Sequence, residues 1–228
     1  VSFFLENQNF FELVKSNINQ IGDLERLVSK TSTLRINPRE IEKLKYSLIS
    51  LSPIKKACLE SDMSILVSLG NNIDLCNDLV EKIENELVEN PPVFLHKGDV
   101  INKGVNIELD DLKEIKNSGK ILLDKMLQNE IDKTSISSLK ISFNNVFGYY
   151  LEVRNIHKDK VPENWIRKQT LVNAERYITP ELKDYESKIL SAQNDISIIE
   201  NKIYSKLVAT IAEKTLLLQK NAQIISRL

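Results

Sequence analysis

The feature that most restricts the fold of this chain is a helical pattern of about forty residues that follows Thr179 and Pro180. Threonine is a favourable N-cap residue, and proline fits the first position of a helix. The apolar residues of this pattern are spaced alternately by three and four positions, and they are Leu182, Tyr185, Ile189, Ala192, Ile196, Ile199 and Ile203. Such a heptad seam needs a partner helix. At 1.5 Å per residue the predicted helix is roughly 60 Å long, which exceeds the width of a domain of this size, so it must project.

The partner is predicted at residues 108–134, where one apolar stripe consists of Leu109, Leu112, Ile115, Leu122, Met126 and Ile131. Past Ile203 the seam continues through Leu207 and Ile211 at intervals of four, a stutter that relaxes supercoiling. We therefore expect residues 108–134 and 180–219 to form antiparallel helices. The segment between them must then lie at their far end.

In that intervening segment the apolar period changes from helical to alternating, which predicts β-strands. Residues 139–143 and 149–154 alternate on either side of the turn sequence 144–146, so they form a predicted hairpin. Further strands are predicted at residues 165–172 and 175–178, giving a β module over residues 136–179. Strand parity places Tyr149 in the core and leaves Tyr150 partly exposed. It also places Arg167 and Gln169 on one face of their strand, and Lys168 and Thr170 on the other.

The N-terminal part is predicted to be helical almost throughout. Residues 21–34 keep helical spacing through Ile21, Leu24, Leu27, Val28 and Leu34. The pair Asn37-Pro38 predicts the start of a helix that runs to about residue 59 with an interruption near Pro53. Another helix is predicted at residues 73–87. Pro91 and Pro92 end that helix, and residues 93–101 look extended and loop-like.

Several classes of function are disfavoured by what the sequence lacks. The glycines form neither GxxxxGK nor GxGxxG, so no nucleotide-binding loop is expected. His96 and His157 have no second ligand at metal-binding spacing, and no arrangement of catalytic side chains is recognisable. The two cysteines lie in apolar, helix-like stretches, which favours a reducing cytoplasmic compartment, and no membrane span is expected. A chain that begins at Val1 and stops at Leu228 inside a helical pattern is predicted to be a segment of a longer protein.

The formal net charge of −1 argues against a general nucleic-acid binder, but its distribution is uneven. Residues 136–179 contain seven basic and four acidic residues, a net charge of +3, so the remaining residues carry −4. The basic residues are Lys140, Arg154, Lys158, Lys160, Arg167, Lys168 and Arg176. A small basic module on an acidic body is what a local phosphate-binding surface requires, although an excess of this size also arises by chance.

One polar run in the module has the side chains that reach phosphate oxygens well: Arg167, Lys168, Gln169, Thr170 and Asn173. Two interpretations stay open. The run binds phosphate, or it is the solvated face of a strand pair in which the cations pair with Glu152 or Glu175 across the sheet. Tyr149 and Tyr150 also suit stacking on single-stranded bases.

Three stretches resemble the corresponding segments of the bacterial MutS family of DNA mismatch-repair proteins. They are NPPVFLHKGDVI (residues 90–101), FGYYLEV (residues 147–153) and RKQTLVNAERYITPELKDYE (residues 167–186). The resemblance implies a mainly α fold with a β insertion, in which long antiparallel lever helices carry a small antiparallel β clamp. It implies a helical core at residues 1–107, levers at 108–134 and 180–228, and a clamp at 135–179.

In that family the clamp contacts the backbone of double-stranded DNA without reading sequence. The polar clamp run matches Arg167, Lys168, Gln169, Thr170 and Asn173, and Lys158 and Lys160 lie in the loop before it. The family's mismatch-reading domain and ATPase have no counterpart in these residues, so ATP and Mg²⁺ are expected only in a full-length protein. We therefore expect no enzyme activity, no cofactor, no small-molecule substrate and no membrane contact. The full-length protein is expected to be a cytoplasmic, nucleoid-associated homodimer.

A second interpretation, from a different class, is a coiled-coil interaction module whose β tip binds a protein. Salt dependence separates the two, because phosphate binding weakens steeply as salt rises, whereas an apolar protein interface need not. A hydrolase or nuclease would need a carboxylate cluster for Mg²⁺, which the β module lacks. Any duplex binding by these residues is expected to be weak and indifferent to mispairs.

Overall fold

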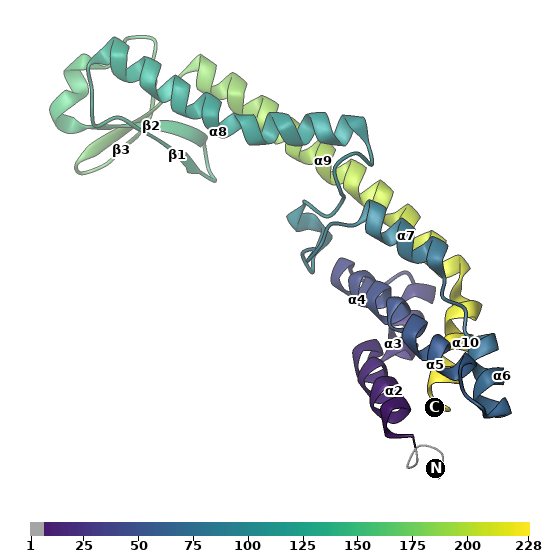
Figure 1. The fold of residues 1–228 in the computed structure, drawn as a ribbon. Coiled ribbons are helices and arrows are strands. Elements are labelled where there is room, and N and C mark those ends of the chain that lie inside the picture. The colour runs from purple at the N-terminus through teal and green to yellow at the C-terminus, as the bar shows by residue number, and fades with distance from the viewer. Residues whose placement is uncertain (1–6) are drawn as a thin grey trace. The chain divides into compact units, whose positions relative to one another are not determined.

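The computed structural model describes residues 7–228, which form two compact units (Figure 1). The first unit contains the residues up to Val105 together with Ile199–Leu228, and the second contains Asn106–Ile198. The first is helical, and the second combines helices with an antiparallel sheet. The predicted class, mainly α with a β insertion, is confirmed. The predicted lever and clamp boundaries divide the chain differently from these units, and they stay a prediction.

The first unit is an assembly of helices with a continuous apolar core. Its elements are α2 (Gln8–Ile21), α3 (Leu24–Ser32), α4 (Pro38–Ile49), α5 (Leu51–Leu59), α6 (Ser64–Asn72), α7 (Asn77–Glu86), η1 (Leu95–Lys97), the last part of α9 (Pro180–Glu213) and α10 (Thr215–Ile225). Ile41, Leu44, Leu48 and Leu51 are completely or almost completely buried at its centre. Apolar side chains at helical spacing on α4 thus supply one wall of the core.

The start of α4 is fixed by a capping box. The Asn37 side chain accepts a hydrogen bond from the Glu40 amide at 3.0 Å, and the Glu40 carboxylate accepts one from the Asn37 amide at 3.1 Å. Pro38 occupies the first helical position, as the sequence predicted. The predicted interruption near Pro53 occurs slightly earlier, between α4 and α5 at Ser50, and Pro53 lies in the first turn of α5.

Four details of the first unit differ from the prediction. Leu34 lies beyond the end of α3 with φ 56° and is exposed, because the chain turns there toward α4. Helix α6 was not predicted, and α7 begins at Asn77 rather than at residue 73, because Cys76 has φ 50°. The predicted helix 180–219 ends at Glu213, where the Lys214 amide donates to the Ile211 carbonyl at 3.0 Å in a tight turn.

The second unit pairs α8 (Ile107–Thr134) with the first part of α9, and they are antiparallel (Figure 1). The predicted seam is confirmed for Leu182, Tyr185, Ile189, Ala192 and Ile196, all of which are buried. It is wrong for the next two positions, because Ile199 and Ile203 are only partly buried. The buried positions shift instead to Glu200, Tyr204, Leu207 and Ile211 in the first unit. There the Glu200 carboxylate accepts a hydrogen bond from the Val100 amide at 3.1 Å.

The predicted stripe of α8 is also only partly correct, because Ile115 and Leu122 are exposed. One residue of α8 that packs closely against α9 is Gly119, which is buried. A Cβ atom at this glycine would lie 2.7 Å from the Tyr185 Oη and 2.9 Å from the Ile189 Cδ1. The two helices therefore approach through a glycine, which a search for apolar residues does not detect.

The sheet consists of β1 (Lys140–Asn144), β2 (Gly148–Arg154), β3 (Ile166–Thr170) and β4 (Ala174–Ile178). All neighbouring strands are antiparallel, in the order β1-β2-β4-β3. The predicted strands are thus confirmed, with bounds that differ by a few residues. The core of this unit contains Ile136, Leu139, Leu151, Val153, Trp165, Tyr177 and Leu182, with Leu123, Met126, Leu127 and Ile131 of α8 packed against it. The sheet therefore lies against the end of α8 and the start of α9.

Candidate nucleic-acid interface

Strand β3 carries most of the predicted contact residues, and it is an edge strand of the sheet. All five of its side chains are exposed. Its pairing with β4 contains an irregularity. Arg167 lies opposite Tyr177, and Gln169, two residues further along β3, lies opposite Arg176, which is only one residue from Tyr177. Lys168 is therefore the extra residue of a β-bulge, a feature that turns a side chain away from the regular pleat.

The bulge reverses the expected faces of β3. Tyr177 and Arg176 are consecutive, so their side chains point to opposite faces of the sheet. Arg167 therefore lies on the same face of the sheet as Tyr177, whose ring packs in the core with α8 and α9. Gln169 lies on the opposite face. The prediction that Arg167 and Gln169 share a face is wrong, because alternation holds only where no residue is inserted.

Arg167 takes part in a small ionic network. Its Nη1 lies 3.3 Å from the Oε1 of Glu175, and the Tyr177 hydroxyl donates a hydrogen bond to the Oε2 of the same carboxylate. The Tyr177 hydrogen bond, the cations Arg167 and Lys158 and the Arg167 hydrogen bond lower the pKa of Glu175, although partial burial opposes them. Burial and the bond to Glu175 raise the pKa of Tyr177 to about 12. Lys158 and Arg167 thus both favour the charged form of this carboxylate, and Arg167 is the cation that pairs with it.

The opposite face of the sheet carries a polar row that crosses all four strands. Lys140 pairs with Glu152, Glu152 with Arg176, and Arg176 with Gln169. The Nε of Arg176 lies 3.2 Å from Glu152, its Nη1 donates to Gln169 at 2.9 Å, and its guanidinium lies 4.5 Å from the centre of the Tyr150 ring.

The two tyrosines of β2 are buried in the opposite order from the prediction. Tyr150 is buried because Arg176 and Phe147 contact its ring, whereas Tyr149 is only partly buried, although it packs against the core. Neither ring is freely available to stack on a base. Stacking on single-stranded bases through this pair therefore loses its structural basis.

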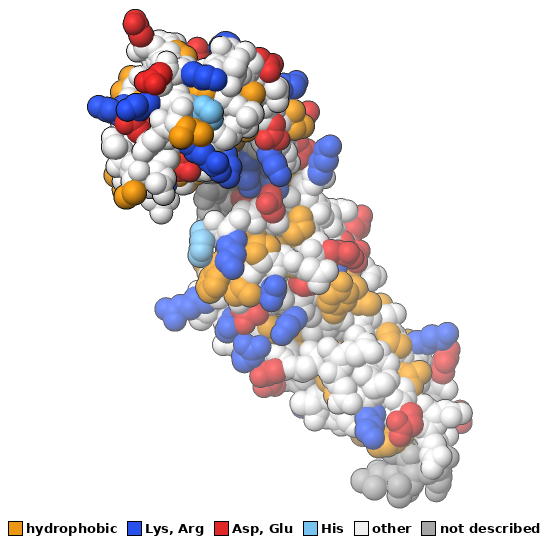
Figure 2. Space-filling view, turned by 90° about the vertical axis from the view of Figure 1, so that its left-hand side faces the viewer, with side chains coloured by type: hydrophobic (Ala, Val, Ile, Leu, Met, Phe, Trp, Pro, Cys, Tyr) orange, Lys and Arg blue, Asp and Glu red, His pale blue; other side chains and the backbone are white. Residues whose placement is uncertain are grey.

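The remaining predicted residues lie at the end of the sheet where β3 and β4 are joined. Asn155, at the start of η2 (Asn155–Lys160), donates its backbone amide to the Asn173 carbonyl at 3.1 Å and its side chain to the Val172 carbonyl at 2.9 Å. The β3–β4 turn with Asn173 is thereby fastened to the segment that carries Lys158 and Lys160, both exposed. Figure 2 looks toward this end of the second unit and shows Lys and Arg side chains with Asp and Glu interspersed.

The predicted residues are therefore not one continuous surface. Arg167 pairs with Glu175, Lys168 projects from the bulge, Gln169 lies on the opposite face, Asn173 occupies the turn, and Lys158 and Lys160 lie on η2. Sequence reasoning did not single out Arg154, which is exposed and lies opposite Ala174 at the same end of the sheet. Its membership of the basic segment was the available signal, but only the strand register places it here.

A structural explanation of β3 also fits its position. Edge strands expose unpaired backbone groups, and natural proteins protect them with charged side chains and bulges. The cations and bulge of β3 serve that purpose whether or not DNA binds.

Within residues 7–228 no group of three or more His, Cys, Asp or Glu side chains is arranged to hold a metal ion. Over the same residues no helix is long and apolar enough to cross a membrane.

Comparisons with known proteins agree with this architecture. A family described as MutS family domain IV matches residues 104–195, which contain the sheet, all of α8 and the first part of α9. The whole chain is 52% identical to the DNA mismatch repair protein MutS of Phocaeicola vulgatus, and 50% identical to the proteins of that name from Bacteroides thetaiotaomicron and Flavobacterium johnsoniae. It spans 26% of the length of each of these relatives. The chain therefore belongs to the MutS family and carries its domain IV.

Proposed function

We propose that residues 135–179 are a clamp that binds the backbone of duplex DNA without reading its sequence. The single observation that carries this proposal is the exposure of Lys158, Lys160, Arg167 and Lys168 on β3 and the adjoining η2. The names of the relatives, DNA mismatch repair proteins, supply the class of ligand. Gln169, Thr170 and Asn173 would add neutral hydrogen bonds to phosphate.

The arrangement favours weak and non-specific binding. The cations point to different sides of a small sheet, so only a few of them can face one duplex. A few phosphate contacts supply only non-specific affinity, with a dissociation constant of about 10⁻⁴ to 10⁻⁶ M at physiological salt. We propose that matched and mismatched duplexes bind this chain equally.

The remaining parts of the proposal concern the longer protein. Residues 108–134 and 180–228 would act as levers that link the clamp to an ATPase elsewhere in the protein. ATP and Mg²⁺ would bind there and not to these residues, which would have no enzyme activity. The intact protein would act as a cytoplasmic homodimer on DNA. The family membership supports each of these proposals.

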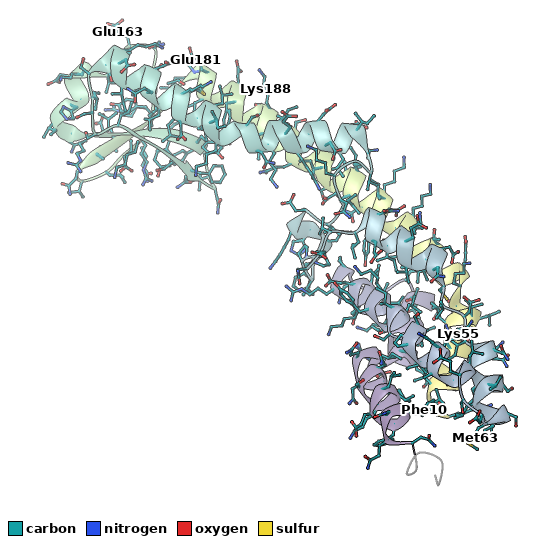
Figure 3. All side chains as sticks on the ribbon, in the orientation of Figure 1. Phe10, Lys55, Met63, Glu163, Glu181 and Lys188 are labelled. Carbon is teal, nitrogen blue, oxygen red and sulfur yellow. The ribbon has the colours of Figure 1, made fainter. Side chains whose placement is uncertain are left out.

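The test is a fluorescence-anisotropy titration of matched and mismatched duplexes across a salt series. Replacing Arg167 and Lys168 together by alanine should flatten the log–log salt dependence by as much as about two units, since each phosphate contact releases roughly 0.9 counterion. Lys183 and Lys188 of α9, both exposed, provide a matched double-alanine control with the same loss of charge (Figure 3 labels Lys188). The control should leave the salt slope unchanged.

Three outcomes contradict parts of the proposal. An unchanged slope with normal binding in the Arg167/Lys168 variant would move the contact surface elsewhere, with Lys158 and Lys160 the next pair to replace. A lower melting temperature with an unchanged slope would assign the two cations to sheet stability alone. A reproducible tenfold preference for the mismatched duplex would contradict the absence of mispair reading, because it needs about 1.4 kcal/mol of discrimination.

A second function, protein interaction through the helices, has one observation in its favour. Ile115 and Leu122 of α8 are about half exposed and lie seven residues apart, so they share one side of the helix. Binding through these side chains would depend little on salt and would be lost on their replacement by serine. The salt series therefore distinguishes the two functions.

A further inference from the structure

We propose that Glu175 is a built-in competitor of DNA phosphate: it occupies Arg167 in the free module and so limits the affinity and the salt dependence of the clamp. This inference rests on the proposed DNA-binding function. It assigns the regulation of the contact surface to an acidic residue that belongs to the sheet itself.

The geometry fixes the carboxylate more firmly than the cation. The Glu175 side chain is 12% exposed, whereas that of Arg167 is 61% exposed. One oxygen of Glu175 lies 3.3 Å from the Arg167 Nη1, and the other accepts the hydrogen bond of Tyr177. Tyr177 is itself held in the core, with its ring 5.9 Å from the ring of Trp165. Arg167 can therefore turn toward a phosphate, while Glu175 cannot follow it.

This pairing changes what Arg167 contributes to binding. A cation without a partner replaces condensed counterions on DNA when it binds a phosphate, and this release drives binding at low salt. Arg167 already has an anion beside it, so a phosphate must share the guanidinium with Glu175 or displace it. The arriving phosphate also meets the negative charge of the carboxylate. Arg167 should thus contribute well under one unit of the salt slope.

Lys168 provides the contrast within the same strand. It projects from the bulge, and within residues 7–228 no ion pair of Lys168 is found. It should contribute the full 0.9 unit of slope for one contact. The structure thus predicts unequal roles for two adjacent cations that look equivalent in the sequence.

The test is the salt series on the whole chain with Glu175→Gln. Glutamine keeps the side-chain size and an oxygen that accepts the Tyr177 hydrogen bond, but it removes the charge. We expect the salt slope to steepen by about one unit. Between 0.2 and 0.05 M salt the affinity of the variant should then rise about three- to fourfold more than that of the wild type.

The matched control is Glu163→Gln. Glu163 is an exposed acidic residue of the same module, in the loop before β3, and Figure 3 labels it at the outer edge of the unit. The substitution makes the same change in net charge without touching the Arg167 network. Glu163→Gln should leave the slope close to that of the wild type.

The outcomes separate the inference from the function on which it rests. If the wild type binds with a salt slope and Glu175→Gln behaves like Glu163→Gln, the inference is overturned and the proposed function stands. If only Glu175→Gln binds DNA measurably, the inference stands, and the proposed binding of DNA by the wild-type chain is contradicted. If neither binds, both fail.

Single alanine variants test the inference even if Glu175→Gln does not fold, which the fluorescence of Trp165 would show. The inference requires Lys168→Ala to flatten the slope by about 0.9 unit and Arg167→Ala to flatten it by clearly less. Equal effects of the two substitutions would overturn it.

Discussion

Replacing Gly119 by valine should destabilise the second unit by about 2 kcal/mol. A Cβ atom at this position would lie 2.7 Å from the Tyr185 Oη and 2.9 Å from the Ile189 Cδ1, and ordinary contacts begin near 3.4 Å. To reach that distance, the Tyr185 Oη must move by about 0.7 Å and the Ile189 Cδ1 by about 0.5 Å. Ile189 can change rotamer, but the Tyr185 ring packs edge-on against Tyr149 with their centres 5.5 Å apart.

The magnitude follows from two opposing contributions. Overpacking of a well-packed contact costs about 1–3 kcal/mol, and the two methyl groups of valine place the cost in the upper part of this range. Valine is a better helix former than glycine by only about 0.3 kcal/mol, so propensity does not compensate. Ser118→Val is the matched control, because Ser118 is the neighbouring exposed residue of α8 and its replacement should change stability by less than about 0.5 kcal/mol.

The assay is urea unfolding followed by tryptophan fluorescence. Trp165 is the single tryptophan of the sequence and lies in the core of the second unit, so its emission reports this unit specifically. The midpoint should fall for Gly119→Val and stay near the wild-type value for Ser118→Val. Equal midpoints for the two variants would refute the claim that α8 and α9 meet through Gly119.

Two further predictions concern the cores of the two units. Leu151→Ala should cost about 2–5 kcal/mol in the same Trp165 assay, because Leu151 is almost fully buried in the sheet core; a loss as small as that of the exposed Val146→Ala would contradict this packing. In the first unit, burial raises the pKa of Glu40, but hydrogen bonds from Lys30, from the Asn37 amide and from Arg26 outweigh it, so the pKa lies below its usual 4.5. The resulting stabilisation is present above about pH 4.5 and is lost as the pH falls through the lower pKa of the folded state. In urea unfolding monitored by circular dichroism, the free energy of unfolding should therefore fall more steeply with acid for the wild type than for Glu40→Gln. Parallel pH profiles would contradict it.

The predictions that the structure confirmed rest on patterns that act within a few residues. Asn37 and Pro38 start a helix through capping and a fixed φ, and both effects are complete within one turn. The alternation of residues 149–154 likewise predicted β2, because a strand has the same period wherever it pairs. The resemblance to MutS was carried by three sequence stretches, residues 90–101, 147–153 and 167–186, and the comparisons confirmed it.

The candidate site was less predictable because its arrangement depends on how strands pair. The sequence identified the basic segment, but nothing in it marks the bulge at Lys168 that sends Arg167 and Gln169 to opposite faces. The sequence left open whether Arg167 and Lys168 pair with Glu152 or Glu175. Among these four residues, all of them described by the structure, the ion pair that forms is the one between Arg167 and Glu175. Which of these residues touch DNA stays a prediction.

The sequence by itself determined most of the helices, the strands and the position of the β module between two helical segments, because periodicity and capping are local. Tertiary structure decided which side of each element is buried. The buried side of α8 includes Gly119 and leaves Ile115 and Leu122 exposed, and the seam of α9 passes to Glu200 instead of Ile199. The physical reason is that burial depends on the partner: a glycine permits close approach, and a carboxylate is buried where backbone amides such as that of Val100 receive it.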